Sequence, residues 1–125
     1  MTKRVLEKLH FKPGYRAIVL NAPGSYKPIL SALPDGVELA DTLDGSFDFI
    51  HVFAIQKAEL DQRVPAIKSA MKSISLLWVS YPKGKSIPTD LNRDILAREL
   101  MKMGLQAVAQ VAIDDVWSAL RFKLV

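Results

Sequence analysis

The feature that most constrains the fold of this chain is a set of short, nearly continuous apolar runs. They occupy residues 15–22 (YRAIVLNA), 47–55 (FDFIHVFAI) and 75–81 (SLLWVSY), and they are rich in β-branched and aromatic side chains. Because apolar residues fill consecutive positions, both faces of each strand need cover. Strands of this kind belong to parallel sheets that carry helices on both sides. The runs therefore predict the central strands of an α/β sheet.

Segments with helical spacing separate these runs. Residues 2–9 and 26–33 predict short helices, each followed by a turn that contains proline and glycine. A longer helix is expected over residues 89–103, with Thr89-Asp90 as its N-cap and Gly104 at its C′ position. The chain thus alternates between strand and helix along most of its length.

One further helical stripe follows the second apolar run and consists of Leu60, Val64, Ile67 and Met71. Pro65 interrupts this stripe, and proline disfavours helical geometry at the residue before it. We therefore expect either two short helices here or one helix that is kinked at Val64.

The last two β runs, residues 105–113 and 117–125, are joined only by Asp114-Asp115-Val116. A connection this short cannot cross between parallel strands, so the two runs are antiparallel neighbours or form a corner. Residues 37–43 predict one more short strand. The order of elements predicts a Rossmann-like three-layer αβα fold in a single domain, residues 1–125, with a mostly parallel sheet and a C-terminal antiparallel hairpin.

The composition excludes several classes of function. The chain has no cysteine and therefore no disulfide, thiolate nucleophile or thiolate metal site. His10 and His51 lack the spacing of metal ligands, so we expect no metal.

No apolar run approaches the ~20 residues that span a bilayer, and residues 1–10 carry too much charge for a secretory signal. We therefore expect a cytoplasmic protein without membrane contact. The net charge is +4, but the basic residues are spread from Lys3 to Lys123 and do not form a run. Nucleic acid is therefore not expected as a partner.

The place of a binding site follows from the predicted sheet. In an open parallel sheet, ligands bind beside the carboxyl ends of the strands, near the point where the strand order reverses. The loops that reach this edge supply the candidate ligand-binding residues: Asn21, Gly24, Ser25, Tyr26, Ser80, Tyr81, Lys83, Lys85, Asp114 and Trp117. No complete catalytic motif accompanies these residues, so no catalytic residue is assigned.

Each part of this set also has a structural interpretation. Residues 83–86 form a basic loop that could hold a phosphate or carboxylate, or a solvated turn. Residues 21–24 fit a type II turn as well as a backbone cradle for a ligand. The pair Asp114-Asp115 is weak evidence for acid–base chemistry and suits a hairpin turn. Trp117 suits packing in the core as well as stacking on a ligand ring.

Several segments together resemble one small bacterial family that is known only as a domain of unknown function. These segments are YRAIVLNAPGSY (residues 15–26), FDFIHVFAI (47–55), LLWVSYPKG (76–84), TDLNRDIL (89–96) and AIDDVWSALRF (112–122). They cover nearly the whole chain, which is identified as a member of that family on this basis. Membership implies no established activity.

The order of elements is also similar to that of class I S-adenosylmethionine (SAM)-dependent methyltransferases, with one strand and its helix missing. Residues 47–53 resemble the fourth strand of that superfamily, residues 75–84 its fifth, and the terminal hairpin its sixth and seventh. The resemblance implies SAM as a cofactor, held by the loop after the first strand and by an acidic residue after the second, here Asp41 or Asp44. The first-strand loop, residues 21–26, has a single glycine where the superfamily has a glycine-rich loop.

These observations leave three hypotheses for the function. The first is a non-catalytic domain that binds a small anionic or nucleotide-like ligand at the strand ends. The second is a SAM-dependent methyltransferase with an atypical cofactor loop, in which Tyr81 or Asp114 positions the acceptor. The third is an interaction module that binds a partner, or a second copy in a homo-oligomer, through a sheet edge or the hairpin that carries Trp117. An open pocket at the strand ends favours the first two, and an exposed apolar patch favours the third.

Overall fold

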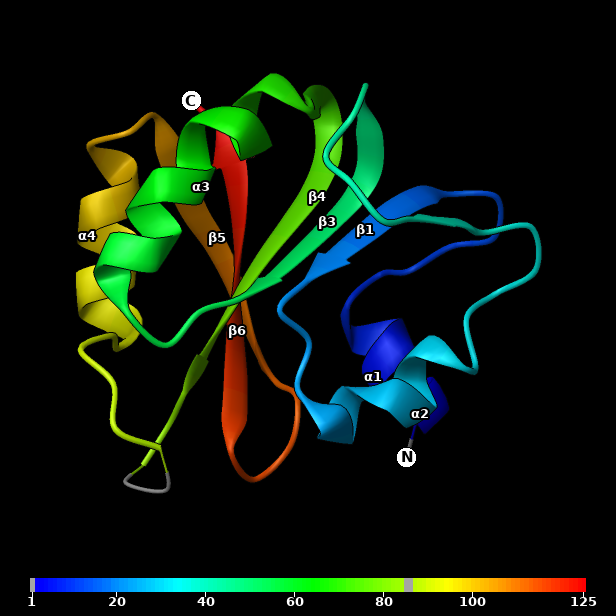
Figure 1. Cartoon of the computed structure of the whole chain (residues 1–125), viewed down its shortest axis with the longest axis horizontal. Helices are drawn as coiled ribbons and strands as arrows, with labels where there is room; N and C mark the ends of the chain where they lie inside the picture. The colour runs from blue at the N-terminus through cyan, green and yellow to red at the C-terminus, as the bar shows by residue number, and fades with distance from the viewer. Residues whose placement is uncertain (1, 85–86) are drawn as a thin grey trace.

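A mixed sheet of six strands forms the middle layer of the protein, in the order β2-β1-β3-β4-β6-β5 (Figure 1). The parallel strands are β1 (Arg16–Leu20), β2 (Glu38–Ala40), β3 (Phe47–Phe53) and β4 (Met71–Pro82). Strands β5 (Leu105–Ala112) and β6 (Trp117–Leu124) form an antiparallel hairpin, and β6 joins this hairpin to the sheet along β4. The computed structural model describes residues 2–84 and 87–125.

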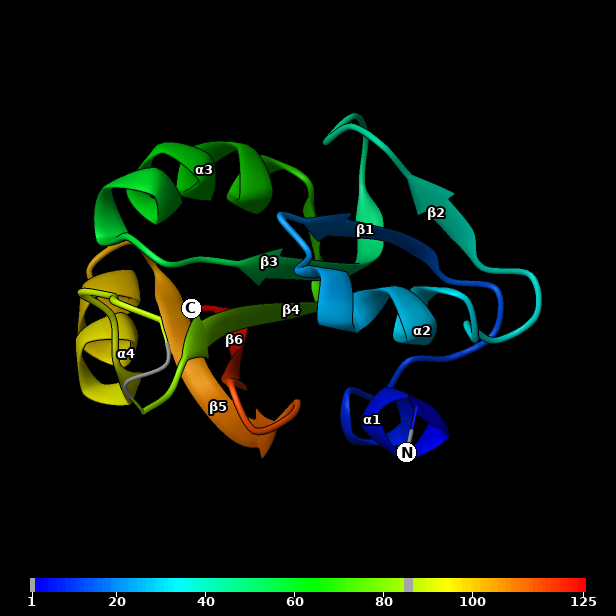
Figure 2. The ribbon, with the colours of Figure 1, turned by 60° about the horizontal axis from the view of Figure 1, so that its bottom comes forward.

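Helices cover both faces of the sheet (Figure 2). One face carries α1 (Thr2–Lys8), the 3₁₀ turn η1 (Gly24–Tyr26) and α2 (Lys27–Leu30), and the other carries α3 (Lys57–Ser69) and α4 (Arg93–Met101). The predicted Rossmann-like three-layer αβα fold, with parallel strands and a C-terminal antiparallel pair, is confirmed. None of the described helices is long and apolar enough to span a bilayer.

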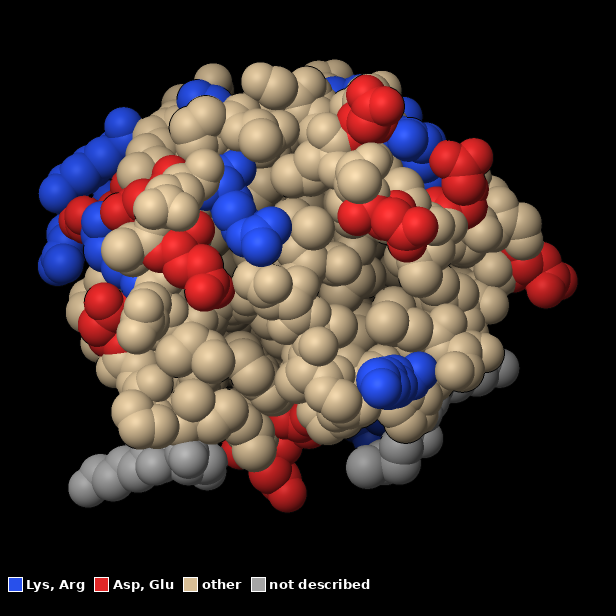
Figure 3. Space-filling model, viewed as in Figure 1, with Lys and Arg blue, Asp and Glu red and all other residues tan. Residues whose placement is uncertain are grey.

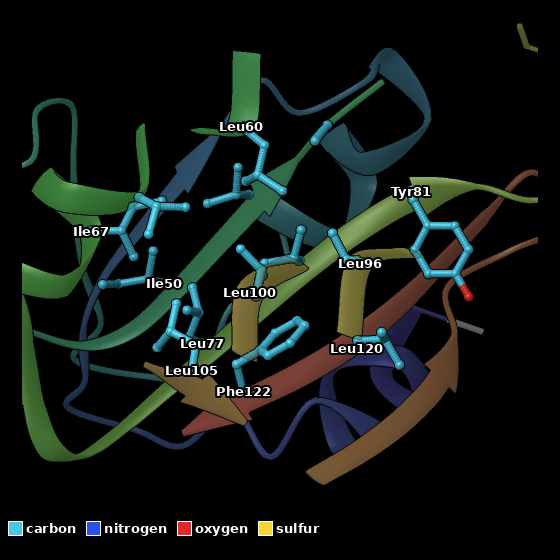
Figure 4. Close-up of a cluster of buried hydrophobic side chains, with 14 of the residues drawn as sticks. Ile50, Leu60, Ile67, Leu77, Tyr81, Leu96, Leu100, Leu105, Leu120 and Phe122 are labelled. Atoms are coloured by element: carbon cyan, nitrogen blue, oxygen red, sulfur yellow. The ribbon is translucent and has the colours of Figure 1, made fainter. Parts of the chain in front are cut away.

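Two clusters of buried side chains fill the spaces between the layers. Figure 4 shows the cluster between the sheet and α3 and α4, which includes Ile50, Leu60, Ile67, Leu77, Tyr81, Leu96, Leu100, Leu105, Leu120 and Phe122. The second cluster lies beneath α1 and α2 and contains both tryptophans, Trp78 and Trp117. The indole N–H of the fully buried Trp78 donates to the carbonyl of Leu9 over 3.0 Å and so fixes the end of α1. Because full burial of a large apolar side chain contributes about 1.5–3 kcal/mol, these clusters hold the sheet that positions the loops.

Helix α3 continues through Pro65 as one helix, so of the two forms expected here the pair of short helices is wrong. Pro65 is exposed, whereas Leu60, Val64 and Ile67 are buried beneath it. A proline inside a helix costs about 3 kcal/mol, while each buried aliphatic side chain contributes about 1.5–3 kcal/mol. Burial of the apolar stripe therefore outweighs the hydrogen bond that the proline removes.

Helix α4 begins later than predicted. Its N-cap is Asn92, whose side-chain oxygen accepts the N–H of Ile95 over 2.8 Å, and not Thr89-Asp90. Asparagine, aspartate and threonine all cap helices well, so their types alone do not rank the three positions. At the other end the helix stops at Met101 with Lys102 as its C-cap, so it ends earlier than predicted and Gly104 lies one residue beyond the C′ position. Gly104 still takes a left-handed conformation, with a φ of +84°.

Candidate functional site

The carboxyl ends of the parallel strands come together at one edge of the sheet. Parallel pairing places the last residues of β1, β2 and β3, namely Leu20, Ala40 and Phe53, toward this edge. The segments that follow these strands, together with the end of β4 and the β5–β6 turn, are called the strand-end surface below: residues 21–26, 41–43, 54–56, 83–84, 87–92 and 113–116. On the face presented in Figure 1, uncharged side chains cover most of the centre, with Lys, Arg, Asp and Glu mainly toward the rim (Figure 3).

Asn21 links the end of β1 to α3. It has a φ of 60°, a left-handed conformation that asparagine tolerates better than most residues. Its amide donates to Oε1 of Glu59 over 3.2 Å, and its side-chain oxygen accepts from Nη2 of Arg63 over 3.3 Å. These exposed contacts add little stability, and they join the first two turns of α3 to the β1 loop.

The β1 loop then turns through η1, where the carbonyl of Pro23 accepts the N–H of Tyr26 over 3.0 Å. The predicted type II turn is wrong, because Gly24 does not adopt the positive φ that such a turn requires at this position. A Cβ atom added at Gly24 would meet nothing within 4 Å. The backbone at Gly24 is therefore open to an approaching molecule.

Tyr26 anchors this loop in the core. Its hydroxyl lies 2.9 Å from Nδ1 of His51, and Nε2 of His51 lies 2.6 Å from Oγ of Ser80. The exposed fractions of Tyr26, His51 and Ser80 are 1%, 0% and 0%. Burial lowers the pKa of His51 to about 3 and raises the pKa of Tyr26. A neutral imidazole donates one hydrogen bond and accepts one, so this buried chain of polar groups satisfies both ring nitrogens.

The segment before α4 folds back over the end of β3. The hydroxyl of Thr89 donates to the carbonyl of Ile55, and the carboxylate of Asp90 accepts the N–H of Lys57 at the start of α3 over 2.8 Å. A cleft of about 380 Å³ opens beside these contacts and is lined by Gln56, Ala58, Pro88, Thr89 and Asp90. The Asp90 carboxylate is the charged group that lines this cleft, and it already accepts the first N–H of α3.

Of the basic loop after β4, the structure describes Lys83, while Lys85 lies outside the described residues. The N–H of Lys83 donates to the carbonyl of Val116 over 2.8 Å, which joins the loop to the β5–β6 turn. The side chain of Lys83 is half-buried. Anion binding by this loop stays a prediction.

A second cleft, of about 290 Å³, lies between α1, the η1–α2 segment and the β5–β6 turn. This hairpin cleft is lined by Val5, Ser25, Pro28, Ile29, Ile113, Asp114 and Asp115. Oδ1 of Asp114 accepts the N–H groups of Val116 and Trp117 over 2.8 Å each, as a residue that closes a hairpin turn does. Its other oxygen, Oδ2, lies 3.5 Å from Oγ of Ser25. The structure thus brings together two of the predicted site residues, Ser25 and Asp114.

Other predicted residues point into the core. Trp117 is 5% exposed and packs edge-on against Phe53, with ring centroids 5.1 Å apart. Tyr81, also 5% exposed, belongs to the cluster under α3 and α4, and its hydroxyl accepts from Nε2 of Gln110 over 3.2 Å. Of the predicted residues that the structure describes, those in the core are Tyr26, Ser80, Tyr81 and Trp117, and the others lie at the edge.

Four residues that shape this edge were not predicted from the sequence: Glu59, Arg63, Thr89 and Asp90. Of these, Asp90 caps α3. Their contacts with the ends of β1 and β3 join residues that are 33 to 42 positions apart. No local motif predicts these partners, because each contact joins segments that only the packed fold brings together. Glu59 and Arg63 carry opposite charges four positions apart on α3, and Thr89 and Asp90 are residue types that cap helices; these were the signals in the sequence.

Solved structures share this fold, among them two methyltransferases and a protein in complex with SAM. A SAM-dependent methyltransferase from Aquifex aeolicus is 14% identical, with 99% of this chain and 89% of that chain covered and a TM-score of 0.74. Magnesium protoporphyrin IX methyltransferase from Synechocystis, with bound S-adenosylhomocysteine (SAH), is 8% identical over 99% of this chain and 83% of that one, with a TM-score of 0.64. LepI in complex with SAM is 19% identical with a TM-score of 0.60, and the match covers 99% of this chain but only 40% of LepI.

No family model matches the chain, and no curated protein sequence matches it. The predicted membership of a bacterial family of unknown function thus stays a prediction, while the methyltransferase-like topology has structural support. At identities of 8–19%, these likenesses establish the fold.

Proposed function

We propose that this chain is a SAM-dependent methyltransferase domain with an atypical cofactor loop, which binds SAM at the strand-end surface. The main support is the match with the Aquifex aeolicus methyltransferase, which covers 99% of this chain and 89% of that chain at a TM-score of 0.74. A match of this extent includes the sheet and the helices on both faces, and not only a shared βαβ unit. That the chain forms one domain, residues 1–125, which works in the cytoplasm, is part of this proposal.

Two features of the strand-end surface fit an adenosyl cofactor. Asp41 directly follows β2, is exposed, and pairs with no cation in the part of the chain that the structure describes. A carboxylate at this place can accept hydrogen bonds from the hydroxyls of a ribose. Gly24, on the neighbouring strand's loop, leaves room for a ligand to approach the backbone.

When bound, SAM supplies a methyl group that its sulfonium sulfur activates for transfer. This chain would hold the ribose through Asp41 and the remainder of the cofactor against the backbone of residues 22–25. Glu59, linked to Asn21 at the same edge and lying beside the guanidinium of Arg63, adds a second carboxylate that can accept hydrogen bonds. Together Asp41 and Glu59 offer acceptors for the hydroxyl and ammonium groups of the cofactor.

The atypical loop has an alternative source of rigidity. A glycine-rich loop gives the backbone its path through glycine conformations, whereas here the buried hydroxyl of Tyr26 fixes the turn to His51. The single glycine, Gly24, stands at the position where the backbone is open. This arrangement supports a loop that holds a ligand without the usual glycine pattern.

The thermal midpoint of unfolding (Tm) tests the proposal. A ligand at about a hundred times its dissociation constant stabilises a protein by about 2.7 kcal/mol, which for a chain of this length raises Tm by about 10 °C. We expect this shift with SAM and with SAH, and we expect Gly24→Val to abolish it without lowering the midpoint of the free protein. Ser73→Val, at the exposed amino-terminal end of β4, is the matched control and should keep the shift. No shift with either compound would contradict the proposal.

A second candidate is a domain that binds a small ligand without methyl transfer. It is favoured because carboxylates at this edge already accept hydrogen bonds that hold the fold. Asp90 accepts the N–H of Lys57, and Asp114 accepts two N–H groups of the β5–β6 turn. Incubation with SAM labelled in its methyl group separates the two candidates. Binding of SAM without formation of SAH, over a broad panel of acceptors, would favour the second.

A further inference from the structure

We propose that the hairpin cleft binds a small amine, with a positively charged nitrogen on a compact apolar body. The cleft measures about 290 Å³ and collects residues from three segments that are distant in sequence. Binding sites for small molecules begin at about 300 Å³, so this cleft suits a molecule of about one ring and a short side chain.

The floor of the cleft is apolar and is held in place by the fold. It is made by Val5 of α1, by Pro28 and Ile29 of α2, and by Ile113 of the β5–β6 turn. Ile29 and Ile113 are each 7% exposed and belong to the buried cluster beneath α1 and α2. The N–H of Ile113 donates to the carbonyl of Trp117 over 2.9 Å, so the turn is fixed before any ligand arrives. A floor of this kind selects an apolar body.

The rim of the cleft offers oxygen acceptors. Oδ1 of Asp114 is engaged by two backbone N–H groups, but Oδ2 has only the long, 3.5 Å contact with Ser25 and can accept a further donor. Asp115 is exposed, and its carboxylate has no hydrogen-bond or ion-pair partner among the described residues. No lysine or arginine stands among the described residues that line the cleft.

The charge of the rim decides the class of ligand. Ionised carboxylates only accept hydrogen bonds, so the ligand must donate, and a cation is attracted where an anion is repelled. The apolar floor and the acidic rim are separate features that select the same class of molecule. A small amine with an apolar body fits both the apolar floor and the acidic rim, whereas an anionic ligand with an apolar body fits only the floor.

The amine site adjoins the proposed cofactor site, because Ser25 belongs both to the hairpin cleft and to the β1 loop. A role for the amine as methyl acceptor rests on the proposed function. The bound ammonium would lose one proton to Asp115 or to water, and the freed lone pair would form a bond to the methyl carbon. The bond between that carbon and sulfur would break, with its electron pair left on sulfur, which gives SAH and an N-methylated ammonium product. Binding of the amine itself does not require SAM.

Three probes of matched shape test the charge requirement, each followed by ¹⁵N NMR titration of the full chain. Phenethylamine, 2-phenylethanol and phenylacetate share a phenyl ring and differ in charge. We expect phenethylamine to shift the amides of Ser25, Ile113 and Asp115, 2-phenylethanol to bind about fivefold more weakly, and phenylacetate to bind most weakly. Equal affinities for the three probes, or shifts that fall elsewhere, would overturn the proposal.

Two variants test the role of the rim. Asp115→Asn should weaken phenethylamine about fivefold and leave 2-phenylethanol unchanged, because the variant removes a charge and little shape. Asp35→Asn, at another exposed turn, is the matched control and should change neither affinity. An Asp115→Asn protein that binds phenethylamine as tightly as the control would overturn the proposal.

A titration with SAH separates this proposal from the proposed function. If the protein binds SAH and phenethylamine together, both proposals are supported. If the two compete for one site, the hairpin cleft is not a separate amine site. If phenethylamine binds and SAH does not, the amine site stands and the proposed function fails.

Discussion

The neutral state of the buried His51 makes the stability of this fold depend on pH within a defined window. Burial lowers the pKa of His51 from 6.5 to about 3. In the unfolded chain the imidazole has its ordinary pKa, so below about pH 6.5 the unfolded chain binds a proton that the folded chain excludes. The free energy of unfolding is therefore highest above about pH 6.5 and falls as the pH decreases toward about 3.

The size of this effect follows from the linkage between proton binding and folding. Each pH unit inside the window costs about 1.4 kcal/mol, so a change from about pH 7.5 to pH 5 removes about 2 kcal/mol. For 125 residues, an unfolding entropy of about 2.1 cal/mol/K per residue converts this loss into a decrease in Tm of about 8 °C. Asp48 and Glu99, whose pKa values are lowered, lose their contributions only below about pH 4.5, outside this interval.

Differential scanning calorimetry of the wild type and of His51→Gln, at pH 7.5, 6 and 5, measures the effect. Glutamine supplies a donor and an acceptor to Tyr26 and Ser80 but does not titrate. We expect Tm of the wild type to fall about 8 °C further than Tm of the variant. The comparison is between the slopes of Tm against pH, so a difference in Tm between the two proteins at one pH does not affect it. Parallel slopes would refute the reasoning, because His51 would then not be held neutral by the fold.

Other predictions concern single contacts. Ser80→Ala removes a partner of the buried imidazole and should cost about 1–3 kcal/mol in urea unfolding; an unchanged midpoint would contradict this. Asp114→Ala removes the acceptor of two turn N–H groups and should cost about 1–2 kcal/mol, and a neutral result would show that the turn forms without it. Gly104 has a φ of +84°, and a Cβ atom added there would lie 3.0 Å from Nζ of Lys68, so Gly104→Ala should cost about 1 kcal/mol. Gly24→Ala should change the free energy of unfolding by no more than about 0.5 kcal/mol, and equal effects of the two variants would contradict the explanation from backbone conformation and space.

The central sheet was predictable because strands that are buried on both faces leave a local pattern. In β3, the buried residues from Phe49 to Phe53 follow one another without interruption, and the long apolar run near the end of β4 has the same cause. The hairpin was predictable because its connection is too short for a crossover. In each case the pattern lies within one segment, and no distant contact is needed to read it.

Helix ends and the polar contacts of the site depend on tertiary structure. Residues 26–33 were expected to form one helix, but the helix covers only Lys27–Leu30 and follows a 3₁₀ turn. This turn ends at Tyr26, whose hydroxyl contacts His51 in the core. Thr89 and Asp90 look like a local N-cap, yet they bond to segments more than thirty positions away. Their residue types suit either use, so only the packed fold distinguishes them.

Binding of SAH to the strand-end surface tests the central claim most directly. In a ¹⁵N NMR titration of the full chain, the account predicts that the amides of the β1 loop (residues 21, 22, 24 and 25), Asp41 and Gln56 shift together on addition of SAH, while those of the outer strand β5 do not. No shift at a saturating concentration of SAH, or shifts confined to residues away from the strand ends, would contradict a methyltransferase domain that binds its cofactor at this edge.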